Sequence, residues 1–120
     1  MIELELQSEV EFPGFRLAAS GHVPLDGIVG LFGPSGHGKS TLLRAIAGLE
    51  RKSRGRIVLD GTVWQDDARR VFVPPHRRGV GYVFQDARLF PHLSVRGNLR
   101  FAARRAPARA SAPGFARVVE

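Results

Sequence analysis

The chain has 120 residues, no cysteine and a formal net charge of +7. This length allows one small domain, and the lack of cysteine excludes disulfides and thiolate metal sites. No apolar run approaches the ~20 residues that span a membrane, and the N-terminus lacks the basic-then-apolar order of a secretion signal. These properties favour a cytoplasmic protein.

The N-terminal residues predict two strands joined by a turn. Acidic and apolar side chains alternate from Ile2 to Leu6, which is the pattern of a half-exposed strand. A second strand is predicted for residues 15–19, after a turn at Phe12-Pro13-Gly14. The glycines, prolines and aspartate of residues 21–27 predict further turns rather than a continuation of the strand.

A glycine-rich stretch at residues 33–41 matches the pattern G-x-x-x-x-G-K-[ST] of phosphate-binding loops. The apolar residues 28–32 before it predict a buried strand, and residues 39–48 after it predict a helix that closes at Gly48. Strand, glycine loop and helix in this order are the context in which the pattern binds a nucleoside triphosphate.

The roles of the loop residues follow from the chemistry of a polyphosphate. Glycines leave the backbone N–H groups uncovered and permit positive φ, and the helix N-terminus favours an anion. Lys39 is expected to reach the β- and γ-phosphates, Ser40 to coordinate Mg²⁺, and Thr41 to contact the α-phosphate. The predicted site is Gly33, Pro34, Ser35, Gly36, His37, Gly38, Lys39, Ser40 and Thr41.

The central part of the chain predicts a hairpin and one more strand. Two β-prone runs within residues 56–64 flank Asp60-Gly61, a strong hairpin-turn signal. Residues 65–79 predict an irregular surface loop, and residues 80–84 predict a buried strand that ends at Gln85.

Beyond that strand, Ser94 is a candidate N-cap for a helix with Val95, Leu99 and Ala102 at helical spacing. Residues 106–114 are rich in alanine, proline and serine and predict a loop. Residues 115–120 are expected to open a further element.

A phosphate loop needs a neighbouring carboxylate to hold Mg²⁺, and two aspartates follow apolar runs. Asp60 is better explained as a residue of a turn, since Gly61 follows it. Asp86 comes one residue after the strand end, which is occupied by the neutral Gln85, a residue able to orient water and approach the metal. If neither aspartate serves, the chain cannot complete a hydrolytic site by itself. The four histidines show no ligand spacing, so zinc is not expected.

The order of these motifs resembles the ATP-binding cassette of ABC transporters. The resemblance is carried by GPSGHGKSTLLRAIAGLE (33–50), GRIVLDG (55–61) and PPHRRGVGYVFQDARLFPHLSVRGNL (74–99). Within the family, VGYVFQDARLFPHLSVRGNLRF is most similar to the ATPases of molybdate importers.

The resemblance implies an α/β fold: a P-loop NTPase (RecA-like) core with an N-terminal antiparallel β subdomain. Residues 1–120 would form a single incomplete ATP-binding domain, with the sheet and nucleotide core in residues 1–86 and the start of a helical subdomain in residues 87–120. The family's signature motif LSGGQ, metal-holding carboxylate, catalytic Glu and switch His are absent from these residues. We therefore expect them beyond residue 120, in a cassette truncated before the signature motif.

The resemblance also implies the ligands and partners: ATP and Mg²⁺, a transmembrane permease subunit, and a second cassette in a head-to-tail dimer on the inner face of the cell membrane. Gln85 matches the glutamine that links the nucleotide site to the membrane subunit, and Ser40 and Gln85 are the implied Mg²⁺ contacts. An aromatic residue near the N-terminus stacks on adenine in the family, and either Phe12 or Phe15 could take this role.

Three functions remain open at this point. The first is an ATP-hydrolysing importer subunit for an oxyanion, with molybdate favoured. The second is a cassette without turnover, acting as a nucleotide-binding or permease-docking module. The third is a phosphate-loop ATPase that acts on nucleic acid through residues 87–120, which hold seven Arg and one Glu. We expect no nucleic-acid binding, because aromatic residues do not alternate with these arginines.

Overall fold

The computed structural model describes residues 2–86 and 88–105. The chain divides into two compact units, Met1–Tyr82 (unit 1) and Val83–Glu120 (unit 2), which we describe separately. The loop predicted at residues 106–114 and the element predicted at residues 115–120 lie outside the described residues. In the described part of the chain, no helix is both long and apolar enough to cross a membrane.

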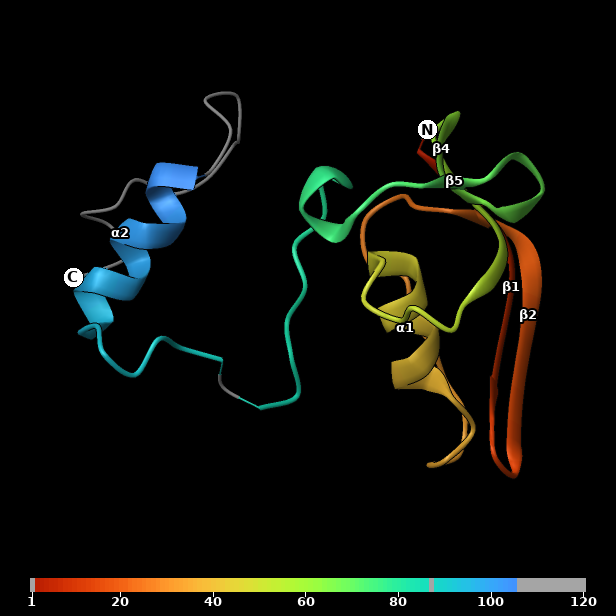
Figure 1. The fold of residues 1–120 in the computed structure, drawn as a ribbon, viewed down its shortest axis with the longest axis horizontal. Helices are drawn as coiled ribbons and strands as arrows, with labels where there is room; N and C mark the ends of the chain where they lie inside the picture. The colour runs from red at the N-terminus through yellow and green to blue at the C-terminus, as the bar shows by residue number, and fades with distance from the viewer. Residues whose placement is uncertain (1, 87, 106–120) are drawn as a thin grey trace. The chain divides into compact units, whose positions relative to one another are not determined.

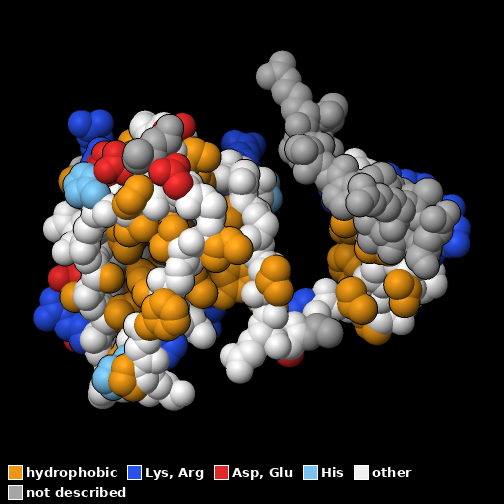
Figure 2. All heavy atoms as spheres, turned by 180° about the vertical axis from the view of Figure 1, so that it is seen from behind, with side chains coloured by type: hydrophobic (Ala, Val, Ile, Leu, Met, Phe, Trp, Pro, Cys, Tyr) orange, Lys and Arg blue, Asp and Glu red, His pale blue; other side chains and the backbone are white. Residues whose placement is uncertain are grey.

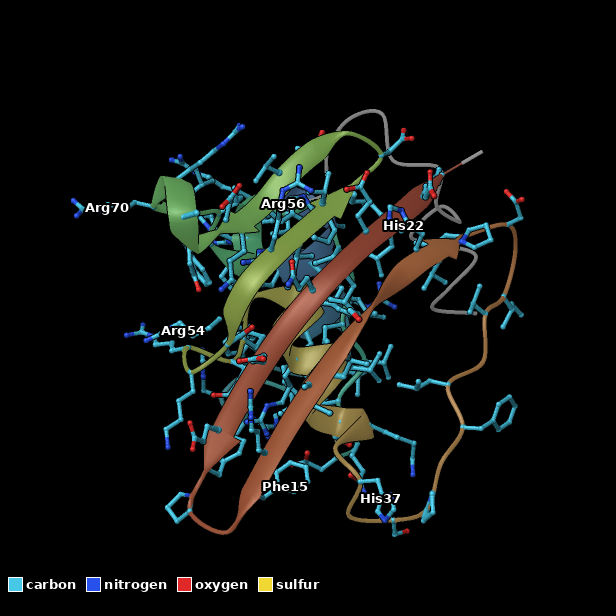
Figure 3. The ribbon with its side chains drawn as sticks, turned by 90° about the vertical axis from the view of Figure 1, so that its right-hand side faces the viewer. Phe15, His22, His37, Arg54, Arg56 and Arg70 are labelled. Carbon is cyan, nitrogen blue, oxygen red and sulfur yellow. The ribbon has the colours of Figure 1, made fainter. Side chains whose placement is uncertain are left out.

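Unit 1 is built on a five-stranded sheet with the strand order β2-β1-β3-β4-β5. Every neighbouring pair of strands is antiparallel, so the predicted N-terminal antiparallel sheet is confirmed. Figure 3 shows β1 and β2 as two long, twisted strands running side by side. The strands are β1 (Glu3–Phe12), β2 (Phe15–Pro24), β3 (Arg54–Leu59), β4 (Thr62–Asp66) and β5 (Val71–Phe72).

The β1–β2 hairpin is longer than the sequence pattern predicts. The pairing is continuous from Phe12↔Phe15 at the predicted turn to Glu3↔Pro24 at the far end. The predicted turns at residues 21–24 are therefore wrong, whereas Gly27 does adopt a positive φ of 72° in a bend. Pro24 is compatible with the strand because β2 is at the edge of the sheet, where a missing N–H is tolerated.

The predicted hairpin at Asp60-Gly61 is confirmed between β3 and β4. Both turn residues have positive φ, 47° for Asp60 and 79° for Gly61, as a two-residue hairpin turn requires. The structure corrects the irregular loop predicted at residues 65–79, since these residues include the end of β4, the short strand β5 and the 3-10 helices η1 (Asp67–Arg69) and η2 (Pro75–Arg77).

The strands predicted at residues 28–32 and 80–84 are wrong for this structure. Neither segment is in a helix or strand, and the side chains of Phe32 and Val83 are 93% and 94% exposed. An apolar run becomes a buried strand only when neighbouring strands satisfy its backbone hydrogen bonds. Among the described residues no strand pairs with either segment, so the parallel core sheet of a P-loop NTPase is not part of the described fold.

The core of unit 1 lies between the sheet and helix α1 (Lys39–Ala47). Leu4, Ile57 and Trp64 form its buried centre, and Ile46 brings α1 against this cluster. Figures 1 and 3 both place α1 against one face of the sheet. Figure 2 shows hydrophobic side chains gathered on one face of unit 1, in keeping with exposed apolar residues such as Phe32 and Leu43.

Unit 2 contains helix α2 (Val95–Arg105), which confirms the predicted helix. The hydroxyl of Ser94 accepts a hydrogen bond from the backbone N–H of Gly97 at 3.0 Å, so Ser94 is the predicted N-cap. The side chain of Asn98 accepts from the N–H of Phe90 at 2.8 Å, and the Phe90 ring packs against Phe101 with centroids 4.6 Å apart. These contacts hold the segment before α2 onto the helix.

Candidate functional site

The glycine loop of residues 33–38 leads directly into the N-terminus of α1. Gly36 and Gly38 adopt positive φ values of 82° and 89°, which glycine accepts without steric cost. Gly33 does not have a positive φ, so the predicted need for a left-handed backbone holds for two of the three loop glycines. The N–H of His37 donates to the carbonyl oxygen of Pro34 at 3.4 Å and closes the turn, while the His37 side chain is exposed.

The N-terminus of α1 has the local charge that an anion requires. Its N-cap is Gly38, which has no side chain to cover the first backbone N–H groups, and the first turn contains no acidic residue. These N–H groups therefore remain as donors at the positive end of the helix dipole. A phosphate placed at this end would meet backbone donors and no opposing carboxylate.

Lys39, Ser40 and Thr41 lie on the first turn of α1, next to the glycine loop. The Lys39 ammonium donates to the carbonyl oxygens of Gly33 and, at 2.9 Å, Pro34. It therefore lies over the loop backbone, within reach of a group bound there. Ser40 is exposed and Thr41 is half-buried. The structure thus brings the predicted loop and the three predicted side chains to one end of the same helix.

The two candidate aromatic residues differ in their relation to the loop. A Cβ on Gly38 would lie 3.0 Å from Cζ of Phe15 and 3.1 Å from Cδ1 of Leu17, so these side chains pack directly against the loop backbone. The Phe12 ring stacks on Phe15 with centroids 6.5 Å apart, and Nζ of Lys52 lies 4.8 Å from its centre. Figure 3 shows Phe15 and His37 at the same end of unit 1.

Gln85 and the two aspartates belong to other parts of the chain than the glycine loop. Gln85 and Asp86 belong to unit 2, where both are exposed in a bend and Asp86 pairs with Arg88 at 3.4 Å. Asp60 occupies the β3–β4 turn, as predicted, and its N–H donates to the carbonyl oxygen of Glu3 at 2.8 Å. The described residues include no group of three His, Asp or Glu side chains that could hold a metal ion.

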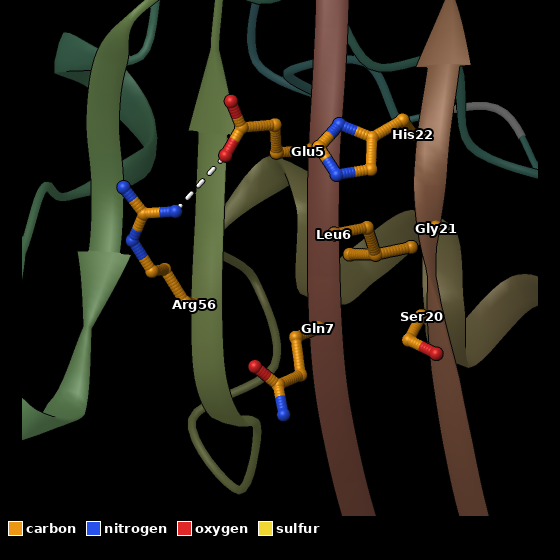
Figure 4. Close-up of a pocket in the computed structure, with 7 residues that line it drawn as sticks. All are labelled: Glu5, Leu6, Gln7, Ser20, Gly21, His22 and Arg56. Atoms are coloured by element: carbon orange, nitrogen blue, oxygen red, sulfur yellow. Dashed lines mark hydrogen bonds and ion pairs between the residues drawn. The ribbon is translucent and has the colours of Figure 1, made fainter.

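A separate hollow lies on the outer face of the sheet, over β1, β2 and β3 (Figure 4). Its charged side chains are already paired, because Nη1 of Arg56 donates to Oε2 of Glu5 at 2.9 Å. His22 also lines it and lies 3.4 Å from the carboxylate of Glu3. The glycine loop, with its backbone donors and an ammonium that donates to neutral carbonyls, is the better anion site.

The sequence pattern missed Arg78, at the other end of α1. This side chain is 2% exposed and donates to the carbonyl oxygens of Ala45 and Ile46, whereas the sequence predicts that residues 65–79 form a surface loop. Burial lowers the pKa of the Arg78 guanidinium, because desolvation disfavours the charged form. Nothing in the local pattern distinguishes Arg78 from its exposed neighbour Arg77.

Comparison with known proteins defines the class. A model of the family described as "ABC transporter" matches residues 18–118. The chain therefore belongs to the ABC transporter family, as the motifs predict.

Among individual relatives, the chain is similar to molybdenum import ATP-binding proteins called ModC. It is 51% identical over 113 residues to ModC of Methylococcus capsulatus, covering 92% of this chain and 31% of that protein. It is 57% identical over 109 residues to ModC of Rhodopseudomonas palustris, covering 89% of this chain and 28% of that protein. It is 50% identical to ModC 1 of Azotobacter vinelandii over 92% of this chain and 31% of that protein. The chain thus spans about a third of the length of these curated relatives.

Proposed function

We propose that residues 33–41 bind ATP, and that the chain supplies the phosphate-loop part of the ATP-binding subunit of an importer for an oxyanion, molybdate. The observation that carries this proposal is the glycine loop at the N-terminus of α1, with Lys39 lying across it. The similarity to relatives named as molybdenum import ATP-binding proteins supports the cargo.

The loop residues fit a triphosphate. The backbone N–H groups at the start of α1 would donate to phosphate oxygens, and Lys39 would exchange two neutral carbonyls for the charged β- and γ-phosphates. Thr41 would donate to the α-phosphate. The exposed hydroxyl of Ser40, on the first turn of α1, suits Mg²⁺. Bound Mg²⁺ would neutralise charge on the β- and γ-phosphates.

We assign adenine stacking to Phe15 in preference to Phe12. The Phe15 ring is the one that packs against Gly38, so a base stacked on it would remain within reach of phosphates bound at the loop. Phe12 stacks on Phe15 and is not among the nearest contacts of Gly38, and the ammonium of Lys52 lies over its ring.

Gln85 is proposed to orient water and Mg²⁺ and to link the nucleotide site to the permease. Hydrolysis needs a carboxylate that neither Asp60 nor Asp86 is proposed to supply, so turnover belongs to the complete importer. There the subunit would work with a permease and a second cassette, at the inner face of the membrane.

Lys39→Ala tests the proposal directly. Removing the ammonium deletes a charge-assisted contact of about 1.5–3 kcal/mol, so ATP affinity should fall roughly ten- to a hundredfold. Equilibrium titration with a fluorescent ATP analogue measures this loss. Lys52→Ala removes the only other lysine of the chain and is the matched control, with affinity near that of the parent. Equal affinities for the parent and Lys39→Ala would contradict the site.

A further inference from the structure

Arg78 is a buried cation held by backbone oxygens. Its Nε donates to the carbonyl oxygen of Val73 at 2.7 Å, and its Nη1 donates to Ile46 at 3.0 Å and Ala45 at 3.3 Å. In the described part of the chain no carboxylate pairs with it, and its Nη2 is buried without a hydrogen-bond partner. A charge buried in this way needs compensation from its surroundings.

The compensation comes from the end of α1 and from two aromatic rings. The last carbonyls of a helix lack partners within the helix and form the negative end of its dipole, so a guanidinium that donates hydrogen bonds to them is favourable there. The guanidinium carbon also lies 4.8 Å from the centre of the Phe72 ring and 5.8 Å from that of Trp64. Arg78 therefore ties the C-terminal end of α1 to the sheet that carries Trp64.

Gly48 shows how closely the helix end fits this side chain. Gly48 is the C-cap of α1 with a φ of 82°, and its N–H donates to the carbonyl oxygen of Ala45. A Cβ at this position would lie 2.7 Å from Nε and 2.8 Å from Cζ of Arg78. The guanidinium thus occupies the space that any larger residue at position 48 would need.

We propose that Arg78 is a positioning residue for the ATP site. By holding the C-terminal end of α1 in place, it determines the position of the N–H groups and of Lys39 at the N-terminal end. The inference rests on the proposed binding of ATP by residues 33–41. A helix of nine residues is about 13 Å long, so a tilt of about 5° at one end displaces the other by roughly 1 Å. A misplacement of about this size in a binding site reduces function by as much as ~10²-fold.

The test compares Arg78→Gln with Arg77→Gln in the full chain, at temperatures at which both variants are folded. Arg77 is exposed, so its substitution removes the same charge without touching α1. Two quantities are measured: affinity for a fluorescent ATP analogue, and the emission of Trp64, which is the only tryptophan and lies beside Arg78.

We expect Arg78→Gln to bind ATP about tenfold more weakly and Arg77→Gln to match the parent. Trp64 emission should respond to ATP in the parent and in Arg77→Gln, and this response should be lost in Arg78→Gln. A role confined to stability would lower the melting temperature alone. Parent-like ATP affinity in folded Arg78→Gln would overturn the inference, whatever the Trp64 response.

The two proposals fail in different ways. A parent chain that does not bind the ATP analogue overturns the proposed function, and the inference with it. A parent that binds, together with an Arg78→Gln variant of equal affinity, overturns the inference alone. If Arg78→Gln does not fold, Arg78→Lys replaces it, because an ammonium keeps the charge but cannot span the three carbonyls. An intermediate loss of affinity then supports the inference, and parent-like affinity overturns it.

Discussion

A positively charged side chain lies at each end of α1, but one charge is favourable for the helix dipole and the other is unfavourable. At the C-terminal end, Arg78 is buried and donates to two carbonyls of the last turn, where a cation is favourable. At the N-terminal end, Lys39 is the first helical residue, where a cation opposes the dipole. An anion bound beside it, as proposed, would give Lys39 a favourable partner at this end, and this difference would separate a structural contact from a ligand site.

The glycines that cap α1 extend the comparison. Both have positive φ, and at both positions an added Cβ would meet a side chain. At Gly48 that side chain is Arg78, which holds the helix in place, and at Gly38 the side chains are Phe15 and Leu17, which line the loop. Substituting each glycine should therefore disturb a different property.

The largest effect on stability is expected from Gly48→Ala. Left-handed backbone costs an alanine about 1–2 kcal/mol, and moving Arg78 away from its carbonyls costs a further ~1–3 kcal/mol. The free energy of unfolding, measured with urea, should fall by about 3 kcal/mol. Gly27→Ala is the matched control, since Gly27 has a φ of 72° and open space around an added Cβ, and is far from Arg78 in sequence, so it should show the backbone cost alone. Equal losses would show that Arg78 adds nothing at this end.

Gly38→Ala should be next in size. The backbone cost is again about 1–2 kcal/mol, and the contacts with Phe15 and Leu17 are less severe than those at Gly48, so a total of about 2 kcal/mol is expected. ATP affinity should also fall, by roughly tenfold or more, because the N–H groups of the loop move. Gly36→Ala carries the same backbone strain in open space and should lose less stability.

Phe15→Leu tests the base end of the site. Stacking of a base on an aromatic ring contributes about 1–3 kcal/mol, so ATP affinity should fall about tenfold. Affinity for inorganic triphosphate should be unchanged, because it has no base to stack. Phe12→Leu is the paired variant and should bind both ligands like the parent. If Phe12→Leu instead gives the selective loss of ATP affinity, the assignment of the two rings must be exchanged.

The parts of the fold that sequence predicts are those decided by local chemistry. Asp60-Gly61 places two residues with positive φ at a hairpin turn, Ser94 caps α2, and Gly48 ends α1, each through bonds to residues close in sequence. The glycine pattern predicts the loop on the same basis. Gly38, Lys39 and Ser40 are consecutive, so the pattern predicts the loop backbone and the positions of the two side chains together.

What sequence does not predict depends on distant partners. Residues 28–32 have the composition of a buried strand, but a strand needs neighbours to accept its hydrogen bonds, and none is present among the described residues. The full length of β2 follows from its pairing with β1 over ten residues, which overrides the turn signals at residues 21–24. Arg78 acts on carbonyls more than thirty positions away, a relation that no local pattern contains.

The smallest effect tests the contrast between the two cations most directly. Without nucleotide, Lys39→Ala removes a positive charge from the N-terminal turn, which is worth about 0.3–1 kcal/mol in favour of folding. It also removes two exposed hydrogen bonds to carbonyls, a loss of similar size. The free energy of unfolding should therefore change by less than about 1 kcal/mol.

Saturating ATP should separate Lys39→Ala from the parent. Ligand at a hundred times its dissociation constant stabilises a folded protein by about 2.7 kcal/mol, and at that concentration the variant should gain much less. Thermal unfolding with and without ATP measures both quantities. A large loss of stability in the absence of ATP would show that Lys39, like Arg78, supports the fold itself, and would remove the distinction between the two ends of α1.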